Sequence, residues 1–421
     1  MTAVTMTGRP FSYPKERICI LLLEGIHPNA VSEFERCGYA AVEQLPGAPD
    51  EDTLIRRLEG VHLLGIRSRT QLTRRVLEAA DRLIAVGCFC IGTDQVDLEA
   101  ARDLGIPVFN APHASTRSVA EMVMGEIIVL MRRLFEANAA THRGEWLKSA
   151  AGSWEIRGKT LGIVGYGNIG TQLGLMAESL GMDVAFYDTA TKLPLGKARR
   201  ATSLHELLGA AQVVSLHVPD LPSTRGMIGA GELAVMPPGS YLVNTSRGHV
   251  VDIESLAAAL RDQRLAGAAV DVFPREPKSA AERFESPLRG LPNTILTPHI
   301  AASTAEAQAR IGDEVAQKLV AYSDVGDTTG AVNFPEVALP LRPGGGVRFM
   351  HVHRNAPGVL GQIVAAFSTR GININAQYLA TQEAVGYVVV DADADAAQAE
   401  CLAELRLLEG AIRARTILDR G

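Results

Sequence analysis

The segment from Thr160 to Gly170 constrains the fold of this chain more than any other part of the sequence. Its first residues, Thr160–Val164, form a mostly apolar run that is typical of a strand buried on both faces of a parallel sheet. The run leads directly into a G-x-G-x-x-G turn, and apolar residues at helical spacing follow. The glycines of this turn are Gly165, Gly167 and Gly170. A strand, a glycine-rich turn and a helix in this order predict a dinucleotide-binding unit.

Each glycine of the turn has its own expected role. Gly165 allows the tight turn, Gly167 lets the backbone approach a pyrophosphate, and Gly170 lets the helix pack closely on the strand. The start of the helix offers free N–H groups and the positive end of a dipole to the phosphates. The other residues of the turn are also expected to line the cofactor: Tyr166, Asn168 and Ile169.

An acidic residue ends the next predicted strand. Asp188 follows the stretch 183–187 and lies 18 residues after Gly170. A carboxylate at this position accepts hydrogen bonds from the adenosine ribose and repels a 2′-phosphate. We therefore expect NAD, rather than NADP, as the cofactor.

The overall composition restricts the classes of partner. The 421-residue chain has a net charge of −6 and 47% hydrophobic residues, which predicts two to three domains and no general affinity for nucleic acid or acidic membranes. The five cysteines form no C-x-x-C pair, so we expect reduced thiols and no metal site. Residues 1–14 lack the apolar core of a signal peptide, and no 18-residue apolar run exists. We expect a soluble, cytoplasmic protein.

Three domains are expected along the chain, all of the α/β class. Strands alternate with helices in residues 15–114 and again in 115–301, which predicts two Rossmann-like parallel-sheet domains. A helix near 306–322 crosses back, so residues 302–343 complete the first domain. Glycines and prolines across 323–346 indicate a linker. Residues 346–421 then follow the β-α-β-β-α-β order of a ferredoxin-like domain.

Three residues of catalytic type follow three predicted strands of the second domain: Arg247, Glu276 and His299. The carboxyl ends of parallel strands meet at one edge of a sheet, where open α/β sheets bind their ligands. A neutral histidine can take the hydroxyl proton while a hydride leaves the same carbon. Glu276 can orient the imidazole, and Arg247 can hold a substrate carboxylate. This set predicts the oxidation of a 2-hydroxy acid.

The chain resembles the D-isomer-specific 2-hydroxyacid dehydrogenase family, and within it the branch that acts on 3-phosphoglycerate and carries a C-terminal ACT domain. The resemblance extends from about Arg17 to Thr416. The motifs that carry it are Gly65-Ile66-Arg67-Ser68-Arg69-Thr70, Val86-Gly87-Cys88-Phe89-Cys90-Ile91-Gly92-Thr93, Phe109-Asn110-Ala111-Pro112, Thr116-Arg117-Ser118-Val119-Ala120-Glu121 and Ser215-Leu216-His217-Val218-Pro219.

This resemblance implies further roles. Asp271 and His217 are implied to lie near the nicotinamide, and Thr245 along the cofactor. The implied reaction is the NAD-dependent oxidation of 3-phosphoglycerate, the first step of serine biosynthesis. Such a polyanion needs local cations, and Arg67 is implied to reach into the cleft. Because Arg69 points the same way as Arg67 in an extended segment, we add it to the substrate set. That set is Arg67, Ser68, Arg69 and Lys148.

The sequence departs from the family pattern at three places. Ala114-Ser115-Thr116 stands where the family has Ser-Asn-Thr, and Asp94 stands where asparagine is usual. Ala301-Ala302 replaces two glycines after the catalytic histidine. We expect this last change to restrict a hinge between domains, because alanine is unfavourable at positive φ.

The C-terminal domain is expected to bind L-serine as an inhibitory effector. Residues 350–360 and 371–379 resemble the serine-binding segments of the family's ACT domain, and the implied ligands are His353, Asn355 and Asn373. We expect the effector site to lie between ACT domains of different subunits, with the triglycine Gly344–Gly346 as a hinge. A homotetramer is expected, because the apolar helix Ser118–Arg133 and the ACT domain each suggest an interface.

Two other functions fit parts of the sequence. Another D-2-hydroxyacid dehydrogenase, such as a hydroxypyruvate or glyoxylate reductase, fits the catalytic set, but Arg67, Arg69 and the C-terminal domain argue against it. A nonenzymatic NAD-sensing regulator fits the glycine turn. The complete catalytic set and the lack of a basic DNA-binding segment argue against that function.

Overall fold

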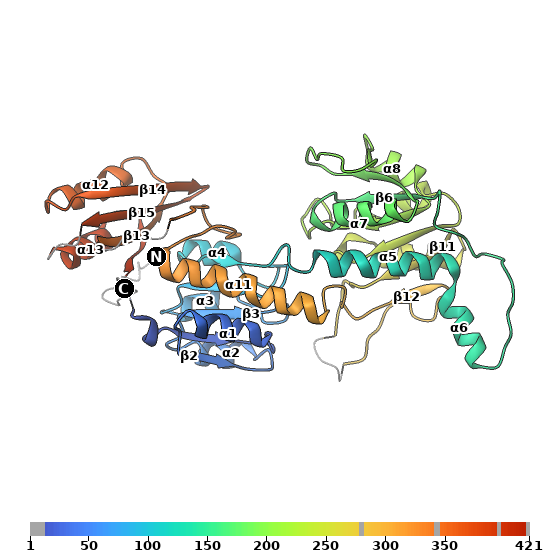
Figure 1. The fold of residues 1–421 in the computed structure, drawn as a ribbon, viewed down its shortest axis with the longest axis horizontal. Coiled ribbons are helices and arrows are strands. Elements are labelled where there is room, and N and C mark those ends of the chain that lie inside the picture. The colour runs from blue at the N-terminus through green and yellow to red at the C-terminus, as the bar shows by residue number, and fades with distance from the viewer. Residues whose placement is uncertain (1–12, 278–281, 341–345, 394–396, 418–421) are drawn as a thin grey trace. The chain divides into compact units, whose positions relative to one another are not determined.

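The computed structural model describes residues 13–277, 282–340, 346–393 and 397–417 (Figure 1). Contacts divide the chain into two compact units, residues 1–112 with 308–421 and residues 113–307, and each is considered separately. Gly344 and Gly345 of the predicted hinge lie outside the described residues. Among the described helices, none is long and apolar enough to cross a membrane. The boundaries of the three predicted domains stay a prediction.

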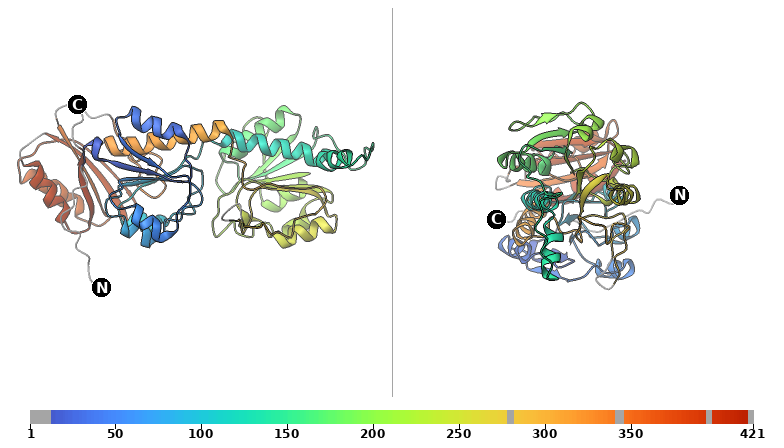
Figure 2. Two further views of the ribbon diagram at one scale, coloured as in Figure 1. Left: turned by 90° about the horizontal axis from the view of Figure 1, so that it is seen from below. Right: turned by 90° about the vertical axis from the view of Figure 1, so that its right-hand side faces the viewer.

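The first unit contains a five-stranded parallel sheet in the order β2-β1-β3-β4-β5. Its core is formed by buried aliphatic residues of the strands and of the helices between them. Figure 2 shows helices on both faces of this sheet. The strands are β1 (Cys19–Leu22), β2 (Ala41–Gln44), β3 (Leu63–Ile66), β4 (Ala85–Cys88) and β5 (Val108–Phe109), and the helices are α1 (Pro28–Arg36), α2 (Glu51–Arg57), α3 (Arg74–Ala79), α4 (Leu98–Asp103) and the long α11 (Ala305–Val325).

Side-chain caps explain where several of these helices begin. Asp50, Thr73 and Asp97 each accept a hydrogen bond from the backbone N–H three residues further on, at the starts of α2, α3 and α4. Such caps satisfy a donor that the helix itself leaves free.

The second unit contains a seven-stranded parallel sheet in the order β12-β11-β10-β9-β6-β7-β8. The order reverses between β6 and β9, which creates the switch point where open sheets of this type bind ligands. The strands are β6 (Thr160–Val164), β7 (Asp183–Tyr187), β8 (Arg199–Arg200), β9 (Val213–Leu216), β10 (Ser240–Asn244), β11 (Leu265–Val270) and β12 (Thr294–Leu296), and the helices are α5 (Thr116–Arg132), α6 (Leu134–His142), α7 (Asn168–Ser179), α8 (Leu204–Ala210), α9 (Ala230–Val235) and α10 (Ile253–Arg261).

Helix α5 is buried within its own unit. Its apolar residues, among them Val123, Ile127 and Leu130, belong to the core cluster that also includes Leu161 and Leu173 of β6 and α7. The apolar character that suggested an intersubunit face for 118–133 is therefore explained by the core of this unit, and it gives no evidence of an interface. Periodicity could not separate the two cases, because both require a helix that is apolar on several sides.

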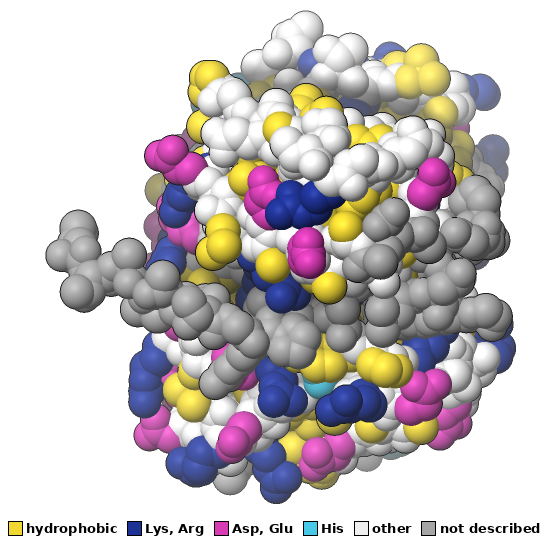
Figure 3. Space-filling model, turned by 90° about the vertical axis from the view of Figure 1, so that its left-hand side faces the viewer, with side chains coloured by type: hydrophobic (Ala, Val, Ile, Leu, Met, Phe, Trp, Pro, Cys, Tyr) yellow, Lys and Arg dark blue, Asp and Glu magenta, His cyan; other side chains and the backbone are white. Residues whose placement is uncertain are grey.

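The C-terminal part of the first unit is an antiparallel sheet in the order β14-β15-β13-β16 with two helices. The elements are β13 (Gly346–Arg354), α12 (Val359–Ser368), β14 (Ile374–Gln382), β15 (Val385–Asp393), α13 (Gln398–Leu407) and β16 (Ala411–Ile417). This is the predicted β-α-β-β-α-β order. Figure 3 views the molecule from this side, where basic and acidic side chains are interspersed. Two parallel α/β sheets and this ferredoxin-like sheet confirm the expected fold class.

The predicted linker begins within α11, which ends at Val325, and several of its described residues are packed. Phe334 and Val337 are buried, and the Asn333 side chain bonds the backbone of Ile106 and Val108 next to β5. Glycine and proline content predicted a linker, but it does not reveal whether a side chain finds such partners. The five cysteines are free thiols.

Candidate active site

The glycine turn lies at the switch point of the second sheet, immediately after β6. Gly165 has a φ of +92°, and a Cβ there would lie 2.3 Å from the backbone oxygen of His217. A Cβ at Gly170 would lie 2.3 Å from the Gly165 oxygen. Both contacts are impossible, so the turn and the close packing of α7 require these glycines. A Cβ at Gly167 would meet no atom within 4 Å. The protein itself leaves space at the start of α7, where a pyrophosphate is expected.

Asp188 is joined to the glycine turn by its side chain. Its Oδ2 accepts a hydrogen bond of 2.9 Å from the Tyr166 N–H, and its Oδ1 accepts one of 2.8 Å from the Ala190 N–H. The carboxylate thus fixes the loop after β7 against the loop after β6. Its expected contact with the ribose remains a prediction.

Tyr166 contributes its backbone to this turn, while its ring belongs to the core. The ring stacks on Phe186 with centroids 3.9 Å apart, and the residue is 1% exposed. Burial raises the pKa of the hydroxyl. A cofactor contact of Tyr166 would therefore involve its backbone. Asn168 and Ile169 begin α7, where backbone N–H groups lack partners within the helix.

His217 follows β9, the strand next to β6 in the sheet, and Thr245 follows β10, the strand next to β9. His217 Nε2 lies 2.9 Å from Ser215 Oγ, and burial lowers the pKa of the imidazole to about 4. His217 is therefore neutral near pH 7 and is a poor proton acceptor. Its Nδ1 and the Oγ1 of Thr245 are buried without a hydrogen-bond partner among the described residues. Buried polar atoms of this kind are normally satisfied, so both fit residues that face a ligand.

The three predicted catalytic residues follow β10, β11 and β12, which are adjacent in the sheet. His299 Nδ1 lies 2.9 Å from Glu276 Oε2 and 3.2 Å from Oε1. Arg247 is close enough to influence the pKa of both. The loop after β10, which carries Arg247, packs closely against the loop after β11. A Cβ at Gly248 would lie 2.0 Å from the Phe273 carbonyl carbon. The structure brings all three residues together.

The contact between Glu276 and His299 shifts the pKa of both side chains. The hydrogen bond that His299 donates to Glu276 raises the pKa of His299, against the opposing effect of burial. Burial raises the pKa of Glu276, but the hydrogen bond and charge of His299 outweigh it, so this pKa lies below its usual value. Because Glu276 occupies Nδ1, Nε2 is the ring nitrogen left for a substrate proton.

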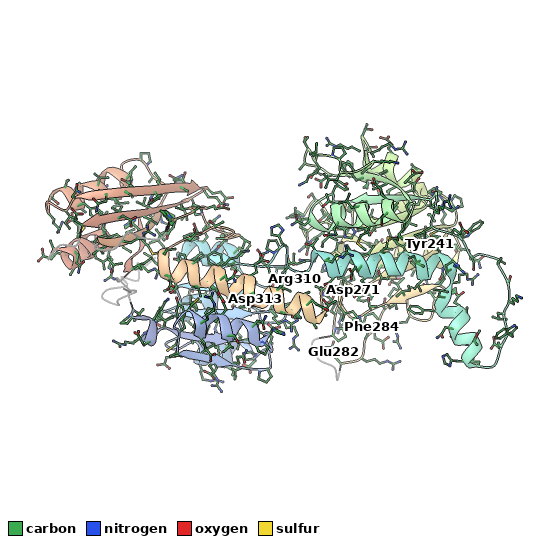
Figure 4. All side chains as sticks on the ribbon, viewed as in Figure 1. Tyr241, Asp271, Glu282, Phe284, Arg310 and Asp313 are labelled. Atoms are coloured by element: carbon green, nitrogen blue, oxygen red, sulfur yellow. The ribbon has the colours of Figure 1, made fainter. Side chains whose placement is uncertain are left out.

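The Asp271 side chain, which is labelled in Figure 4, is hydrogen-bonded to the turn that carries His299. The buried Asp271 carboxylate accepts hydrogen bonds from the Ile300 N–H at 2.8 Å, the Ala301 N–H at 2.9 Å and the Thr297 hydroxyl at 2.6 Å. The His299 N–H donates to the Asp271 backbone oxygen at 2.8 Å. Thr297 was not predicted as functional, although it belongs to the same Thr-Pro-His stretch. The implied contact of Asp271 with nicotinamide stays a prediction.

The structure bears on two of the three departures from the family pattern, those at Ser115 and at Ala301-Ala302. Neither Ala301 nor Ala302 has a positive φ; the residue of this turn that does is His299, at +56°. Alanine is therefore unstrained at both positions in this conformation. Ser115 is fully buried, and its Oγ has no partner among the described residues.

The substrate residues divide between the two units. Arg67, Ser68 and Arg69 follow β3 in the first unit, with Arg69 Nε 3.5 Å from Glu24 Oε2. Lys148 belongs to the second unit, on the exposed segment after α6. This segment lies at the opposite end of the unit from Asp271 (Figure 4). Lys148 is exposed, and its expected contact with the substrate stays a prediction.

The three effector residues do not meet in one domain. His353 is 3% exposed, and Asn355 Nδ2 donates to the Glu383 oxygen at the turn between β14 and β15. Asn373 precedes β14 at its other end, where its oxygen accepts from the Asp393 N–H. The nine residues of β14 span roughly 30 Å. One amino acid cannot touch both asparagines of a single chain.

Comparisons with known proteins identify the family of this chain. A family model for the NAD-binding domain of D-isomer specific 2-hydroxyacid dehydrogenases matches residues 124–301, and one for an AHAS small subunit-like ACT domain matches residues 349–413. The solved TT0316 protein of Thermus thermophilus is 31% identical with a TM-score of 0.68, covering 75% of this chain and 100% of its own. D-lactate dehydrogenase of Aquifex aeolicus, solved with NAD and lactic acid, is 26% identical with a TM-score of 0.67 over the same shares.

Relatives in sequence match over almost the whole chain. D-3-phosphoglycerate dehydrogenase of Escherichia coli K12 is 54% identical over 407 residues, 96% of this chain and 99% of the relative. The enzyme of the same name from Dictyostelium discoideum is 47% identical over 406 residues, 96% and 98% of the two chains. The resemblance seen in the sequence is confirmed: the chain belongs to the NAD-dependent D-3-phosphoglycerate dehydrogenases, a branch of the D-isomer-specific 2-hydroxyacid dehydrogenase family.

Proposed function

We propose that this protein oxidises 3-phospho-D-glycerate to 3-phosphohydroxypyruvate with NAD. The observation that carries the proposal is the Glu276–His299 pair, 2.9 Å apart at the carboxyl edge of a sheet whose glycine turn suits a dinucleotide. Near-complete alignment with D-3-phosphoglycerate dehydrogenases supports the substrate.

The described residues fit NAD. Space at Gly167, the carboxylate of Asp188, and the unpartnered Thr245 Oγ1 and His217 Nδ1 would face the pyrophosphate, ribose and nicotinamide in turn. NAD, when bound, supplies the acceptor for the hydride that leaves C2 of the substrate.

The residues of this chain supply the acid–base chemistry. His299 Nε2 takes the C2 hydroxyl proton, and the charge of Glu276 stabilises the resulting imidazolium. Arg247 binds the substrate carboxylate and polarises the C2 oxygen as it becomes a carbonyl. The pKa of His217, lowered to about 4 by burial, makes it a weak base and leaves the role of base to His299.

The substrate assignment is tested by NADH formation with 3-phosphoglycerate, glycerate and lactate. We expect 3-phosphoglycerate to give by far the highest kcat/KM. A higher kcat/KM for one of the other acids would replace this proposal with another D-2-hydroxyacid dehydrogenase, and NAD binding without turnover of any of them would favour a regulator.

We further propose that the protein is a homotetramer and that one interface involves α6 and the segment after it. Large apolar side chains are exposed there: Leu134, Phe135, Trp146, Leu147 and Trp154. Such clusters mark interaction surfaces. Lys148, which follows Leu147, would then serve the substrate site of a second subunit. Sedimentation that gives a monomer at micromolar concentration would contradict this assembly.

The effector proposal is L-serine held between two ACT domains. β14 is an edge strand of its sheet, and an open edge can pair with a second copy. Antiparallel pairing of two β14 strands would bring Asn373 of one subunit to the end of the sheet that holds Asn355 of the other. Serine would thus meet His353 and Asn355 of one chain and Asn373 of its neighbour.

Subunit mixing tests this arrangement. Asn355→Ala and Asn373→Ala should each abolish the heat of serine binding in calorimetry. A mixed assembly of the two variants should regain about half of the sites, because one of every two sites would again have both asparagines. No recovery in verified mixed assemblies would exclude a shared site, and no heat with the unmodified protein would exclude serine as the effector.

A further inference from the structure

The loop that carries Arg67 and Arg69 is organised by a buried acid, Glu24. This residue follows β1, is 4% exposed and has a φ of +61°. A non-glycine residue rarely adopts this left-handed conformation, and a glutamate gains nothing locally from it. Hydrogen bonds from the Glu24 and Gly25 N–H groups to the oxygens of Gly47 and Leu45 hold the strained turn.

The strained turn directs the Glu24 carboxylate into the loop after β3. Oε1 accepts hydrogen bonds from the Arg67 N–H at 3.0 Å and the Thr70 N–H at 2.9 Å. Oε2 accepts one from the Arg69 N–H at 3.1 Å and forms an ion pair of 3.5 Å with Arg69 Nε. Three backbone donors of four consecutive residues thus converge on one carboxylate, which fixes the backbone of the loop.

A second buried side chain holds the same loop from the next strand connection. Gln95 is 7% exposed, and its Nε2 donates to the Arg67 backbone oxygen at 2.7 Å and to the Gly92 oxygen at 3.4 Å. The Arg67 peptide is therefore held at its N–H by Glu24 and at its oxygen by Gln95. The Arg69 side chain is 52% exposed, although its Nε forms the ion pair with Glu24.

We propose that Glu24 is a positioning residue, which sets the direction in which Arg67 and Arg69 meet an anionic substrate group. The inference rests on the proposed function of these arginines and adds the residue through which their geometry is fixed. A carboxylate is required, because it accepts on both oxygens. A glutamine would turn an amide N–H₂ toward at least one N–H that needs an acceptor, and the loop would move away from it.

The test is Glu24→Gln, with Asp50→Asn as the matched control. Asp50 also accepts a backbone hydrogen bond, 2.9 Å from the Thr53 N–H, but it caps α2 on the exposed surface. We expect Glu24→Gln to raise KM for 3-phosphoglycerate about 10-fold to 100-fold, the effect of a small misplacement of a binding group. The kcat and the dissociation constant of NADH should stay within about twofold. A merely structural loss would lower the active fraction and kcat, with KM unchanged.

A combined variant separates this inference from the function on which it rests. If Glu24 acts through the two arginines, then Glu24→Gln added to a variant with both Arg67→Ala and Arg69→Ala should raise KM no more than that arginine variant alone. Additive increases, or an unchanged KM in Glu24→Gln, would overturn the role of Glu24. An unchanged KM in Arg67→Ala would instead contradict the substrate role of Arg67. If Glu24→Gln does not fold, Gln95→Met is the second variant, because it removes the donor to the Arg67 oxygen. It too should raise KM for 3-phosphoglycerate, and an unchanged KM would count against the proposal.

Discussion

Replacing Glu276 by glutamine tests the central acid–base assignment. The hydrogen bond between Glu276 and His299 Nδ1 is the largest cause that raises the pKa of His299. Glutamine keeps the shape of the side chain but removes its charge, so the pKa of His299 should fall. In the oxidation His299 must be neutral at the start, and kcat therefore rises with pH through this pKa. The acid limb of the kcat profile should move to lower pH in Glu276→Gln.

The size of this shift follows from distance and exposure. An opposite charge at close range moves a pKa by about 1–3 units. The side chains of His299 and Glu276 are 46% and 37% exposed, so water and salt screen their attraction. We therefore expect a shift to lower pH that is smaller than that of a fully buried pair. The imidazolium formed during catalysis loses the same stabilisation, which lowers the maximal kcat by up to about 10-fold.

The assay is the pH dependence of kcat for NADH formation at saturating 3-phosphoglycerate. Glu285→Gln is the matched control, because it makes the same change at an exposed glutamate that pairs with Arg283 and Arg289. Its profile should equal that of the unmodified protein. An acid limb that stays in place in Glu276→Gln, or moves to higher pH, would refute the view that Glu276 supports a charged His299.

Three further outcomes are expected from single changes. His299→Ala should lower kcat by about 10²–10⁴-fold while NADH binding, followed by fluorescence, persists; half the original kcat would exclude His299 as the base. Arg67→Ala should raise KM for 3-phosphoglycerate by about 10-fold to 150-fold with little change in NADH affinity, through loss of a charge-assisted contact. The unmodified protein should prefer NAD to NADP in kcat/KM, and Asp188→Ala should reduce that preference, because no carboxylate would then oppose a 2′-phosphate.

The sequence predicted best the features that depend on local spacing. Gly170 is required by a local contact with the Gly165 oxygen, and Gly165 by its left-handed φ. Arg247, Glu276 and His299 could be placed together because each follows a predicted strand, and parallel strands end at one edge. In both cases the topology of the sheet converts positions along the chain into positions in space.

Features that depend on long-range partners were not predictable in the same way. Glu24 lies 43 residues before Arg67, and a single glutamate after a strand carries no signal that its carboxylate turns into another loop. Asn355 and Asn373 are close in sequence, yet the full length of β14 separates them. The packing of Asn333 against residues 106–108 likewise depends on a distant pair of backbone groups.

Two acidic residues control His299 from different sides, and their roles should separate experimentally. Glu276 contacts the imidazole ring, so its charge acts on the proton that the ring carries. Asp271 instead accepts hydrogen bonds from the backbone N–H groups of the two residues after His299. These bonds offset the left-handed φ of His299, a conformation that is unfavourable by about 1–3 kcal/mol. The charge of Asp271 also raises the pKa of His299, but less than Glu276 does. A change at Glu276 therefore acts chiefly through the pKa of His299, whereas a change at Asp271 acts chiefly through the geometry of the turn.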